Sequence, residues 1–479
     1  MNTILIYPQL EFSKAQIPAP PYSILFIADY LNKRHVNVKI FDLRFDKNLD
    51  VLNEISLNEL EYIGISVMTG PQIKYALRIS ELIKKKFNEI KIVWGGMHPT
   101  IRPKQTLKHP LIDLVVRGEG EKTYFELVSG RELEKIDGLS FKRGNKIIHN
   151  KERILMSDSE INELSIPWEL MKPKYYINNQ NFNLITSRGC PYQCAFCYNS
   201  MAKNRWRGWT VDKCIHEFNK VLNYDVKKIT FYDDNFFANP KRISGIFNYL
   251  KEHDIIWKAE IRVDRLDLPL AEAAKKAGCR QLFFGAESGS ERLLKLIMKN
   301  ITIQDIIKSA KITKKVGLVA DYSWMVGIPG EKQIDRKKTI SLIKKIKKIN
   351  PECEFSIKIL YPYPRTLIFQ EAVNHGFKPP VNLIEWSNVR REKAPDYLED
   401  KNRLEMISLV SAIVGRKVFE ISDIPFLKIL KFYADFRWEY EFFDVGIENF
   451  LFKISRGIIN KFMNRKSSKG YDQFSQKII

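Results

Sequence analysis

The sequence predicts an α/β protein. We expect an N-terminal doubly wound parallel sheet of the Rossmann type, then a partial (β/α)6 barrel of the TIM type, then a mainly helical C-terminal region. Short strand-like runs alternate with helical periods over residues 1–150, which is the pattern of a parallel sheet covered by helices. Six more strand–helix units can be read from 183 to about 362, as in a partial barrel. Residues after 366 lack this alternation.

The composition is that of a globular protein without a disulfide framework. At 479 residues and 44% hydrophobic content, the chain can form two or three packed domains. Three of its six cysteines, Cys214, Cys279 and Cys353, lie in apolar or helical contexts typical of buried core residues. The first residues do not form a secretory signal, and no run reaches the roughly 18–20 apolar residues that cross a bilayer. The sequence therefore predicts a cytoplasmic protein.

The net charge of +22 has two interpretations. A basic excess is typical of proteins that bind nucleic acid or an anionic membrane surface. Lysine pairs such as Lys337-Lys338 and Lys344-Lys345 recur at helical spacing, however, and indicate solvated helix faces. No nucleic-acid-binding fold is evident in the sequence, so we expect no nucleic-acid partner.

The predicted strands of the first domain, residues 1–150, end in loops of small and polar residues. We expect strands at 3–7, 36–41, 62–67, 90–94 and 112–116, with helices at 22–33 and 71–87 among the connections. Ligands of such sheets bind beyond the carboxyl ends of the strands, and glycines let the backbone approach a bulky ligand closely. The loop residues at those ends are Ser66 and Thr69, then Gly95, Gly96 and His98, then Gly118 and Glu119.

Three cysteines share one short loop after the strand expected at 183–187. Cys190, Cys194 and Cys197 have the spacing C-x3-C-x2-C, which can hold three irons of a cubic iron–sulfur cluster. No fourth cysteine lies nearby, so one iron would keep an open coordination position. The alternatives are a zinc knuckle or three incidental cysteines. Zinc sites usually add a second cysteine pair or histidines, and His216 has no ligand-like partner nearby.

The next two barrel strands, expected at 228–232 and 257–262, end in charged residues. Asp233 and Asp234 follow the first of them, and either could bind an amine or cap a helix. Arg262 ends the second strand. Its guanidinium suits a carboxylate ligand, although an ion pair with Asp264 or Asp267 is an equal alternative.

The remaining barrel strands, expected at 280–285, 318–325 and 353–361, end in distinctive motifs. Glu287 and Ser288 belong to the run Gly285-Ala286-Glu287-Ser288-Gly289-Ser290. A carboxylate buried at a strand end seldom lacks a partner. A glycine–proline turn follows at 327–330, and the run from Tyr361 to Thr366 carries a P-x-P-x-T pattern.

Together, these motifs resemble those of the radical S-adenosylmethionine (radical SAM) enzymes. The ordered loops of residues 1–150 resemble the cobalamin-binding domain that precedes the radical core in one large branch of that family. The resemblance covers residues 1–366. This chain lacks the Gly-Gly-Glu motif of many members, and an Asp-Asp variant stands in its place. It also lacks the D-x-H-x-x-G segment, which leaves the lower axial ligand of cobalt undetermined. A flavin or nucleotide module is the alternative for the first domain, but no G-x-G-x-x-G run supports it.

The resemblance implies three cofactors, namely a [4Fe–4S] cluster, S-adenosylmethionine (SAM) and cobalamin, and a one-electron reductant such as flavodoxin or ferredoxin. It implies that the three cysteines bind the cluster and that a second set of residues positions SAM, with Phe196 and the Tyr198 main chain beside the adenine. A third set would line the cobalamin pocket, where His98 could equally contact the tail or be structural. The SAM set is Phe196, Tyr198, Asp234, Arg262, Glu287 and Ser288, and the cobalamin set is Ser66, Thr69, Gly95, Gly96, His98, Gly118 and Glu119.

The predicted boundaries are a linker at 151–182, a radical core at 183–366 and a helical region at 367–479 with a disordered end from residue 463. Segment 425–463 is rich in aromatic and basic residues. We expect its aromatic stripe to pack against the barrel. The alternative is peripheral contact with an anionic membrane surface.

The resemblance implies a C-methyltransferase that abstracts hydrogen from an unactivated carbon and then delivers a methyl group from methylcobalamin. Two alternatives are a cyclase or oxidase of the same branch, similar to the anaerobic Mg-protoporphyrin ester cyclase, and a non-catalytic cobalamin or cluster sensor. No catalytic acid or base is assigned. The substrate is a small or lipid-like molecule whose identity the sequence does not reveal.

Overall fold

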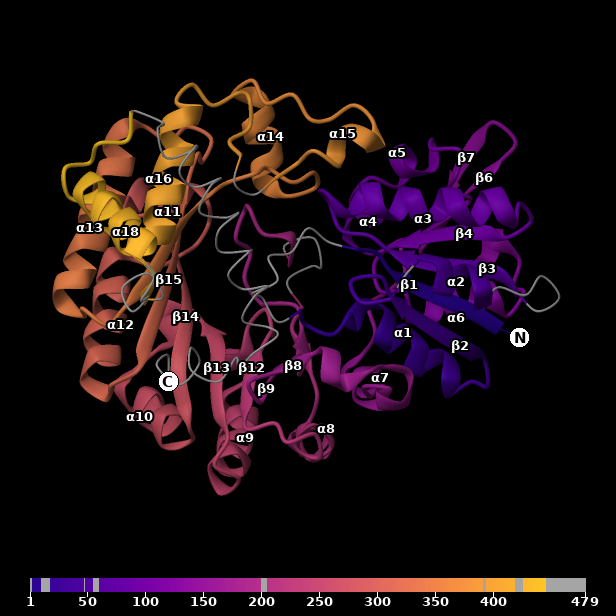
Figure 1. Cartoon of the computed structure of the whole chain (residues 1–479), viewed down its shortest axis with the longest axis horizontal. Helices are drawn as coiled ribbons and strands as arrows, with labels where there is room; N and C mark the ends of the chain where they lie inside the picture. The colour runs from indigo at the N-terminus through magenta and orange to yellow at the C-terminus, as the bar shows by residue number, and fades with distance from the viewer. Residues whose placement is uncertain are drawn as a thin grey trace.

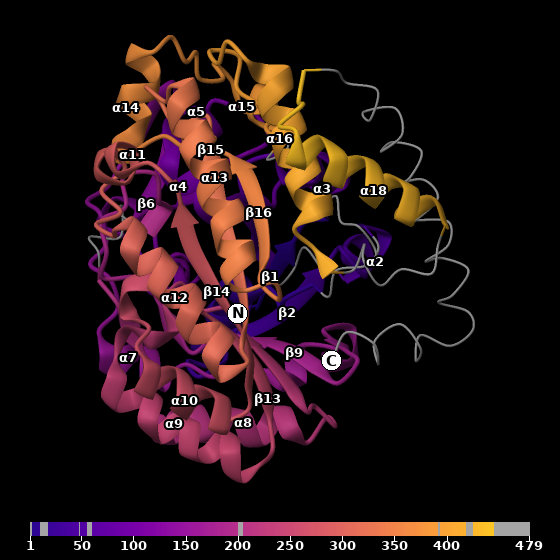
Figure 2. The same cartoon turned by 90° about the vertical axis from the view of Figure 1, so that its left-hand side faces the viewer.

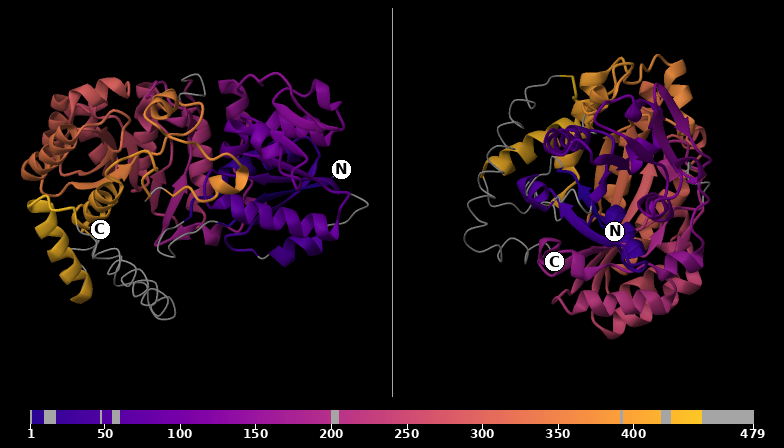
Figure 3. Two further views of the ribbon diagram at one scale, coloured as in Figure 1. Left: turned by 90° about the horizontal axis from the view of Figure 1, so that it is seen from above. Right: turned by 90° about the vertical axis from the view of Figure 1, so that its right-hand side faces the viewer.

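The computed structural model describes residues 2–9, 18–46, 48–54, 60–199, 205–390, 393–417 and 425–444. Two α/β lobes lie side by side along the long axis of the molecule, and a C-terminal segment runs across both (Figures 1 and 3). The first lobe contains the N-terminal sheet and the second contains the barrel. This arrangement confirms the predicted fold class.

The N-terminal sheet has seven strands in the order β2-β1-β3-β4-β5-β6-β7. Strands β1 to β5 are parallel, as predicted. The prediction missed the antiparallel hairpin β6–β7 at one edge, although the two residues between its strands, Gly144-Asn145, are a typical hairpin turn. The strands are β1 (Asn2–Tyr7), β2 (Asn37–Asp42), β3 (Leu60–Ser66), β4 (Lys91–Gly95), β5 (Leu114–Val116), β6 (Leu139–Arg143) and β7 (Lys146–His149).

Helices cover both faces of this sheet. Helices α1 and α6 pack on one face, where Leu5 meets Ile24 and Tyr124, and α3 packs on the other face against Ile63 and Ile65. The helices of this lobe and of the connection to the barrel are α1 (Tyr22–Asn32), α2 (Asn48–Glu54), α3 (Gln72–Lys86), α4 (Met97–Ile101), α5 (Pro103–Leu107), α6 (Glu121–Val128) and α7 (Asp158–Glu163).

The barrel sheet has the order β16-β15-β14-β13-β12-β9-β8. The six strands from β9 to β16 are parallel and match the six that were predicted, while the short β8 adds to the edge in the antiparallel sense. Their bounds are β8 (Ile177–Asn178), β9 (Asn181–Leu184), β12 (Lys228–Phe231), β13 (Ile256–Ile261), β14 (Cys279–Glu287), β15 (Val319–Val326) and β16 (Glu354–Ile359). Strand β9 thus begins inside the predicted linker.

The barrel helices lie outside the strands (Figure 2). They are α8 (Val211–Leu222), α9 (Pro240–Glu252), α10 (Leu268–Lys276), α11 (Glu291–Leu296), α12 (Ile303–Val316) and α13 (Gln333–Ile349). Cys214, Cys279 and Cys353 are buried in this lobe, as expected for core residues.

The C-terminal region hydrogen-bonds to backbone groups of β16, the edge strand of the barrel sheet. It contains α14 (Leu367–Asn374), α15 (Leu383–Trp386), α16 (Lys401–Val414) and α18 (Pro425–Glu439). The Ile357 N–H donates to Ser411 Oγ (2.9 Å) and the Ile357 carbonyl accepts from Ser408 Oγ (2.8 Å). An edge strand with unpaired backbone groups invites pairing with other chains, and these two contacts occupy backbone groups of that edge.

The tail helix α18 has two different faces. Leu430, Ala434 and Trp438 are buried, and the Trp438 ring lies 5.1 Å from the Phe355 ring. Phe432 and Phe436 on the other face are 77% and 50% exposed. The expected packing against the barrel therefore holds for one face only, and contact with a membrane surface stays a prediction. Within the described ranges, no helix combines the length and the apolarity that crossing a bilayer requires. The end predicted to be disordered lies outside the described residues.

Candidate functional site

The three cysteines lie on one excursion of the chain between two short strands. Strand β10 (Ser187–Arg188) pairs antiparallel with β11 (Arg207–Gly208), so all three cysteines fall between them. Cys194 is buried, and Cys190 and Cys197 are half-buried. Ala195 fixes the loop to the barrel, because its N–H donates to the Ile297 carbonyl (2.8 Å) and its carbonyl accepts from the Ile368 N–H (2.9 Å).

Three thiols on one loop are the donor set that three irons of an iron–sulfur cube require. Among the described residues, no group of three His, Cys, Asp or Glu side chains is placed to hold one metal ion. A cube does not need such convergence, because each thiolate binds a different iron. Burial raises the pKa of Cys194, whereas the neighbouring cations Lys299 and Arg262 act to lower it. Burial also raises the pKa of Cys197, to about 11. Lys299 and Arg262 can therefore stabilise the thiolate charge of Cys194 when a cluster is bound.

The structure separates the roles of Asp233 and Asp234. Asp233 is 1% exposed, and its carboxylate accepts from the Thr186 N–H, from Thr186 Oγ1 (2.9 Å) and from the Ser187 hydroxyl. Its carboxylate is therefore buried and held by residues of the barrel. Asp234 instead accepts from the Gly189 N–H (3.1 Å) beside Cys190 and faces a cavity described below. Of the two carboxylates, Asp234 is the one placed to bind a ligand.

Glu287 is paired with a residue that the sequence analysis missed. The Lys299 ammonium donates to Glu287 Oε1 at 2.7 Å, and both side chains are less than one tenth exposed. Glu287 has a φ of 61°, a strained conformation for a residue with a Cβ and one that is often found at functional sites. Ser288 is fully buried and accepts from the Ser290 N–H (3.1 Å), so it shapes this turn. Lys299 was hidden among many lysines, and no local pattern marks it.

Arg262 is already bound within the protein. Its guanidinium donates to both carboxylate oxygens of Asp264 (2.9 and 3.2 Å) and to the Lys299 carbonyl (2.9 Å). The same group lies 3.8 Å from the centre of the Tyr192 ring, which belongs to the cysteine loop. The ion pair with Asp264, one of the two sequence-based alternatives, is therefore present, and Arg262 also supports the loop.

Phe196 and Tyr198, which flank Cys197, face different neighbours. Phe196 is half-buried against the barrel core. Burial raises the pKa of Tyr198, whereas its hydrogen bond with Thr100 acts to lower it, so the Tyr198 hydroxyl reaches the N-terminal lobe.

In the glycine–proline turn, the Gly327 N–H donates to Glu331 Oε2 (2.7 Å), and burial raises the pKa of Glu331 to about 7.

A cavity of about 280 Å³ lies at the carboxyl ends of the N-terminal strands. Ser66, Gly95, Gly96, Gly118 and Glu119 line it, as the sequence predicted for a cofactor pocket. A Cβ on Gly118 would meet no atom within 4 Å, so the backbone there borders open space. The cavity continues to the barrel, where Ser187, Arg188, Tyr232 and Asp234 complete its wall.

Thr69 and His98 do not line this cavity, so that part of the prediction is not supported. Their side chains hydrogen-bond to one another, from Thr69 Oγ1 to His98 Nδ1 at 3.2 Å. His98 is 0% exposed beside the Trp386 ring (5.7 Å), and its Nε2 has no partner among the described atoms. Burial and the Arg102 charge lower the pKa of His98 to about 3. This is the environment of a neutral structural histidine.

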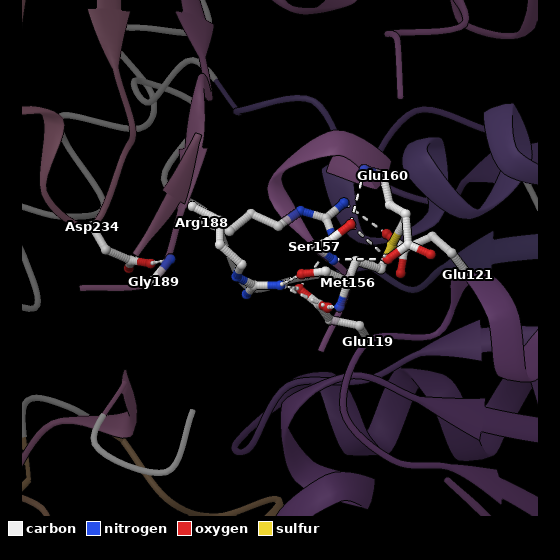
Figure 4. Close-up of polar contacts among 9 residues, drawn as sticks. Glu119, Glu121, Met156, Ser157, Glu160, Arg188, Gly189 and Asp234 are labelled. Atoms are coloured by element: carbon white, nitrogen blue, oxygen red, sulfur yellow. Dashed lines mark hydrogen bonds and ion pairs between the residues drawn. The ribbon is translucent and has the colours of Figure 1, made fainter. Parts of the chain in front are cut away.

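Glu119 and Glu121 connect the two lobes electrostatically (Figure 4). Arg188 donates to Glu119 (3.3 Å) and to Glu121 (2.6 Å), and Arg207 donates to Glu119 at 3.0 Å. Burial alone would raise the pKa of Glu119, but the two guanidiniums bring it below its ordinary value. Glu119 also accepts from the Met156 N–H at 2.8 Å. Its predicted cofactor contact is thus shared with an ion-pair role that the sequence did not indicate.

Comparison with known proteins identifies both lobes. Residues 184–343 match the Radical SAM superfamily, and residues 12–128 match the B12 binding domain. An uncharacterised methyltransferase of Pyrococcus horikoshii, PH0819, is 33% identical over 81% of this chain and 87% of its own length. The anaerobic magnesium-protoporphyrin IX monomethyl ester cyclase of Rubrivivax gelatinosus is 25% identical over 78% of this chain and 70% of its own.

Two solved structures share the fold. The cobalamin-dependent S-adenosylmethionine radical enzyme OxsB, solved with aqua-cobalamin and S-adenosylmethionine, has a TM-score of 0.71 at 17% identity over 97% of this chain and 75% of its own. The radical S-adenosylmethionine methyltransferase TsrM of Kitasatospora setae, solved with cobalamin and a [4Fe–4S] cluster, has a TM-score of 0.64 at 17% identity over 78% of each chain.

Proposed function

We propose that this chain, which belongs to the radical SAM superfamily and carries a B12-binding domain, transfers a methyl group to an unactivated carbon of a small molecule. It is a cobalamin-dependent radical SAM enzyme with methyltransferase relatives. One observation carries the proposal. The cavity of the cobalamin-binding lobe opens onto the barrel at Tyr232 and Asp234, next to the cysteine loop. Both cofactor sites therefore border one space in which a substrate can lie between them.

The described residues support a division of labour. Cys190, Cys194 and Cys197 would hold a [4Fe–4S] cluster. The carboxylate of Asp234, which faces the cavity and accepts a hydrogen bond from the Gly189 N–H, would also accept the amine of SAM. Glu287 is strained and buried at the end of β14, two strands along the sheet from the strand that precedes Asp234, and it would contact the polar groups of SAM. When bound, these cofactors supply a 5′-deoxyadenosyl radical and a methyl group.

A second set of residues would hold the cobalamin tail. Ser66 hydrogen-bonds to Ser23 (2.8 Å) at the cavity wall, and Gly95, Gly96 and Gly118 leave room for a bulky group. Among the described residues that line this cavity there is no histidine, and His98 lies outside its wall. We therefore propose that the chain supplies no histidine to cobalt.

Product analysis tests the proposed reaction. The anaerobically reconstituted chain, loaded with hydroxocobalamin, is incubated with isotopically labelled SAM, a flavodoxin reducing system and a small-molecule extract from a strain that lacks the gene. Methylation predicts both deoxyadenosine and S-adenosylhomocysteine, with label in one extract component. A chain with Cys190, Cys194 and Cys197 replaced by alanine is the control and should release no deoxyadenosine.

Other product patterns would contradict the proposal. Deoxyadenosine without S-adenosylhomocysteine would indicate a cyclase-like reaction, which the similarity to the magnesium-protoporphyrin ester cyclases keeps as an alternative. Neither product would favour a sensor.

A further inference from the structure

The loop that carries the three cysteines closes on a very short base. We call the strands β10 and β11 the neck, because the chain leaves the barrel at Arg188 and returns at Arg207. The neck has only two residue pairs, of which Arg188 opposite Arg207 is the one nearer the loop. Isolated two-stranded ladders are marginal in water even when they are longer. The neck therefore needs support from elsewhere.

The cross-strand pair of the neck is unfavourable by itself. Two arginines directly opposite one another repel, and here they are largely buried, with side-chain exposures of 19% and 3%. Burying charge without a counter-charge is costly. Two positive charges at the base of the cysteine loop thus require two negative charges.

The cobalamin-binding lobe supplies both negative charges. Glu119 contacts Arg188 (3.3 Å) and Arg207 (2.9 Å), so one carboxylate joins the two strands of the neck. Glu121 forms an ion pair with the other terminal nitrogen of the Arg188 guanidinium at 2.6 Å. Both carboxylates come from the loop after β5 and the first residue of α6, in a different lobe from the arginines. The neck is therefore complete only when the lobes are in contact.

The same residues face both ligand sites. Glu119, Glu121 and Arg188 all line the cavity of the cobalamin-binding lobe. On the other side, Gly189 follows Arg188 directly and donates to Asp234, the carboxylate proposed to bind SAM. A ligand that moves either carboxylate must move the neck, and a shift of the cysteine loop must move the carboxylates.

We infer that the ion pairs of Glu119 and Glu121 with the neck make the binding of cobalamin and the binding of SAM depend on each other. Arg188 is then a positioning residue for the cluster loop. Because linkage is reciprocal, each ligand must change the affinity for the other by the same factor. The inference rests on the proposed ligand sites, but it adds a coupling between them that neither site requires.

Binding measurements without turnover test the inference. The full-length chain with its cluster oxidised is titrated with hydroxocobalamin, with and without saturating SAM, and the reverse titration is also made. We expect a mutual increase of at least about fivefold in the wild type. In Glu119→Gln, which removes the charge shared by both arginines, the factor should fall close to one.

Glu126→Gln is the matched control. Glu126 lies on α6, which begins at Glu121, but its ion pairs with Arg153 (2.5 Å) and Arg131 (3.2 Å) do not involve the neck. This variant should keep the wild-type factor. If the role of Glu119 is purely structural, Glu119→Gln lowers the affinity for each ligand but keeps the factor by which each ligand raises the affinity for the other. That result would overturn the inference. If Glu119→Gln loses its cluster, Glu121→Gln provides the same test, because it removes only one contact of Arg188.

The outcomes separate the two proposals. Binding of both ligands with no mutual effect in the wild type would overturn the coupling and leave the proposed function intact. A chain that binds neither ligand would overturn both.

Discussion

The buried histidine His98 gives a prediction whose size follows from its environment. Its Nδ1 is bonded to Thr69, and a proton on Nε2 would find no acceptor while lying near the Arg102 cation. The pKa of His98 therefore falls from its ordinary 6.5 to about 3 in the folded chain. As the pH drops below 6.5, the unfolded chain binds this proton and the folded chain does not. Stability is full above that pH and is lost progressively toward pH 3.

The loss can be calculated at an accessible pH. At pH 4.5, two pH units below the unfolded pKa, this one group lowers the free energy of unfolding by about 2.7 kcal/mol. In His98→Phe the ring can still lie beside Trp386, but it does not titrate. Urea unfolding of the apo chain at pH 7.5 and 4.5, followed by tryptophan fluorescence, should show a loss about 2.7 kcal/mol smaller in the variant than in the wild type. If the free energy of unfolding falls equally in both proteins between pH 7.5 and 4.5, His98 is not a buried, neutral side chain.

Four further predictions concern the barrel. Lys299→Met strands the Glu287 charge and should destabilise the chain by about 3–5 kcal/mol, whereas adding Glu287→Gln should recover much of this in thermal unfolding. Asp234→Asn should weaken SAM binding at least about tenfold, by equilibrium dialysis, with little change in melting temperature. Asp233→Asn should instead lower stability by about 1–3 kcal/mol, because its buried network is broken. Glu331→Gln should raise stability by up to about 3 kcal/mol at pH 8, because burial penalises the charged carboxyl. This gain should fade as the pH falls from 7 toward 4.5.

Each of these predictions has a contradicting result, and for Asp233→Asn it is an unchanged stability. If Lys299→Met and the double variant unfold alike, the two side chains do not form a buried pair. Unchanged SAM affinity in Asp234→Asn would show that the Asp234 carboxylate does not bind SAM. A Glu331→Gln variant whose stability changes equally at pH 8 and pH 5 would show that the wild-type carboxyl has an ordinary pKa.

Local pattern was enough to predict the framework of the molecule. Every predicted strand exists, because alternation of strands and helices follows from the burial of a parallel sheet on both faces. The hairpin β6–β7 was missed although Gly144-Asn145 is an adequate turn signal. The cysteine loop was found because its ligands lie within eight residues of one another.

Residue roles that depend on distant partners could not be read from the sequence. Nothing local shows that Asp233 bonds to Thr186, 47 positions earlier, and so leaves Asp234 as the available carboxylate. The burial of His98 depends on Trp386, which is brought over it by a segment that follows the barrel. Ion pairs between lobes, such as that of Arg188 with Glu119, need both lobes to be placed before they can be recognised.

The most direct test of the account is spectroscopy of the cluster. After anaerobic reconstitution with iron and sulfide, we expect a cubane that gives the EPR spectrum of a [4Fe–4S]+ centre on reduction, with g-values that shift when SAM is added. Alanine at Cys190, Cys194 and Cys197 should abolish both signals. A reduced cubane whose spectrum ignores SAM, or no cubane in a chain with all three thiols intact, would contradict the central claim.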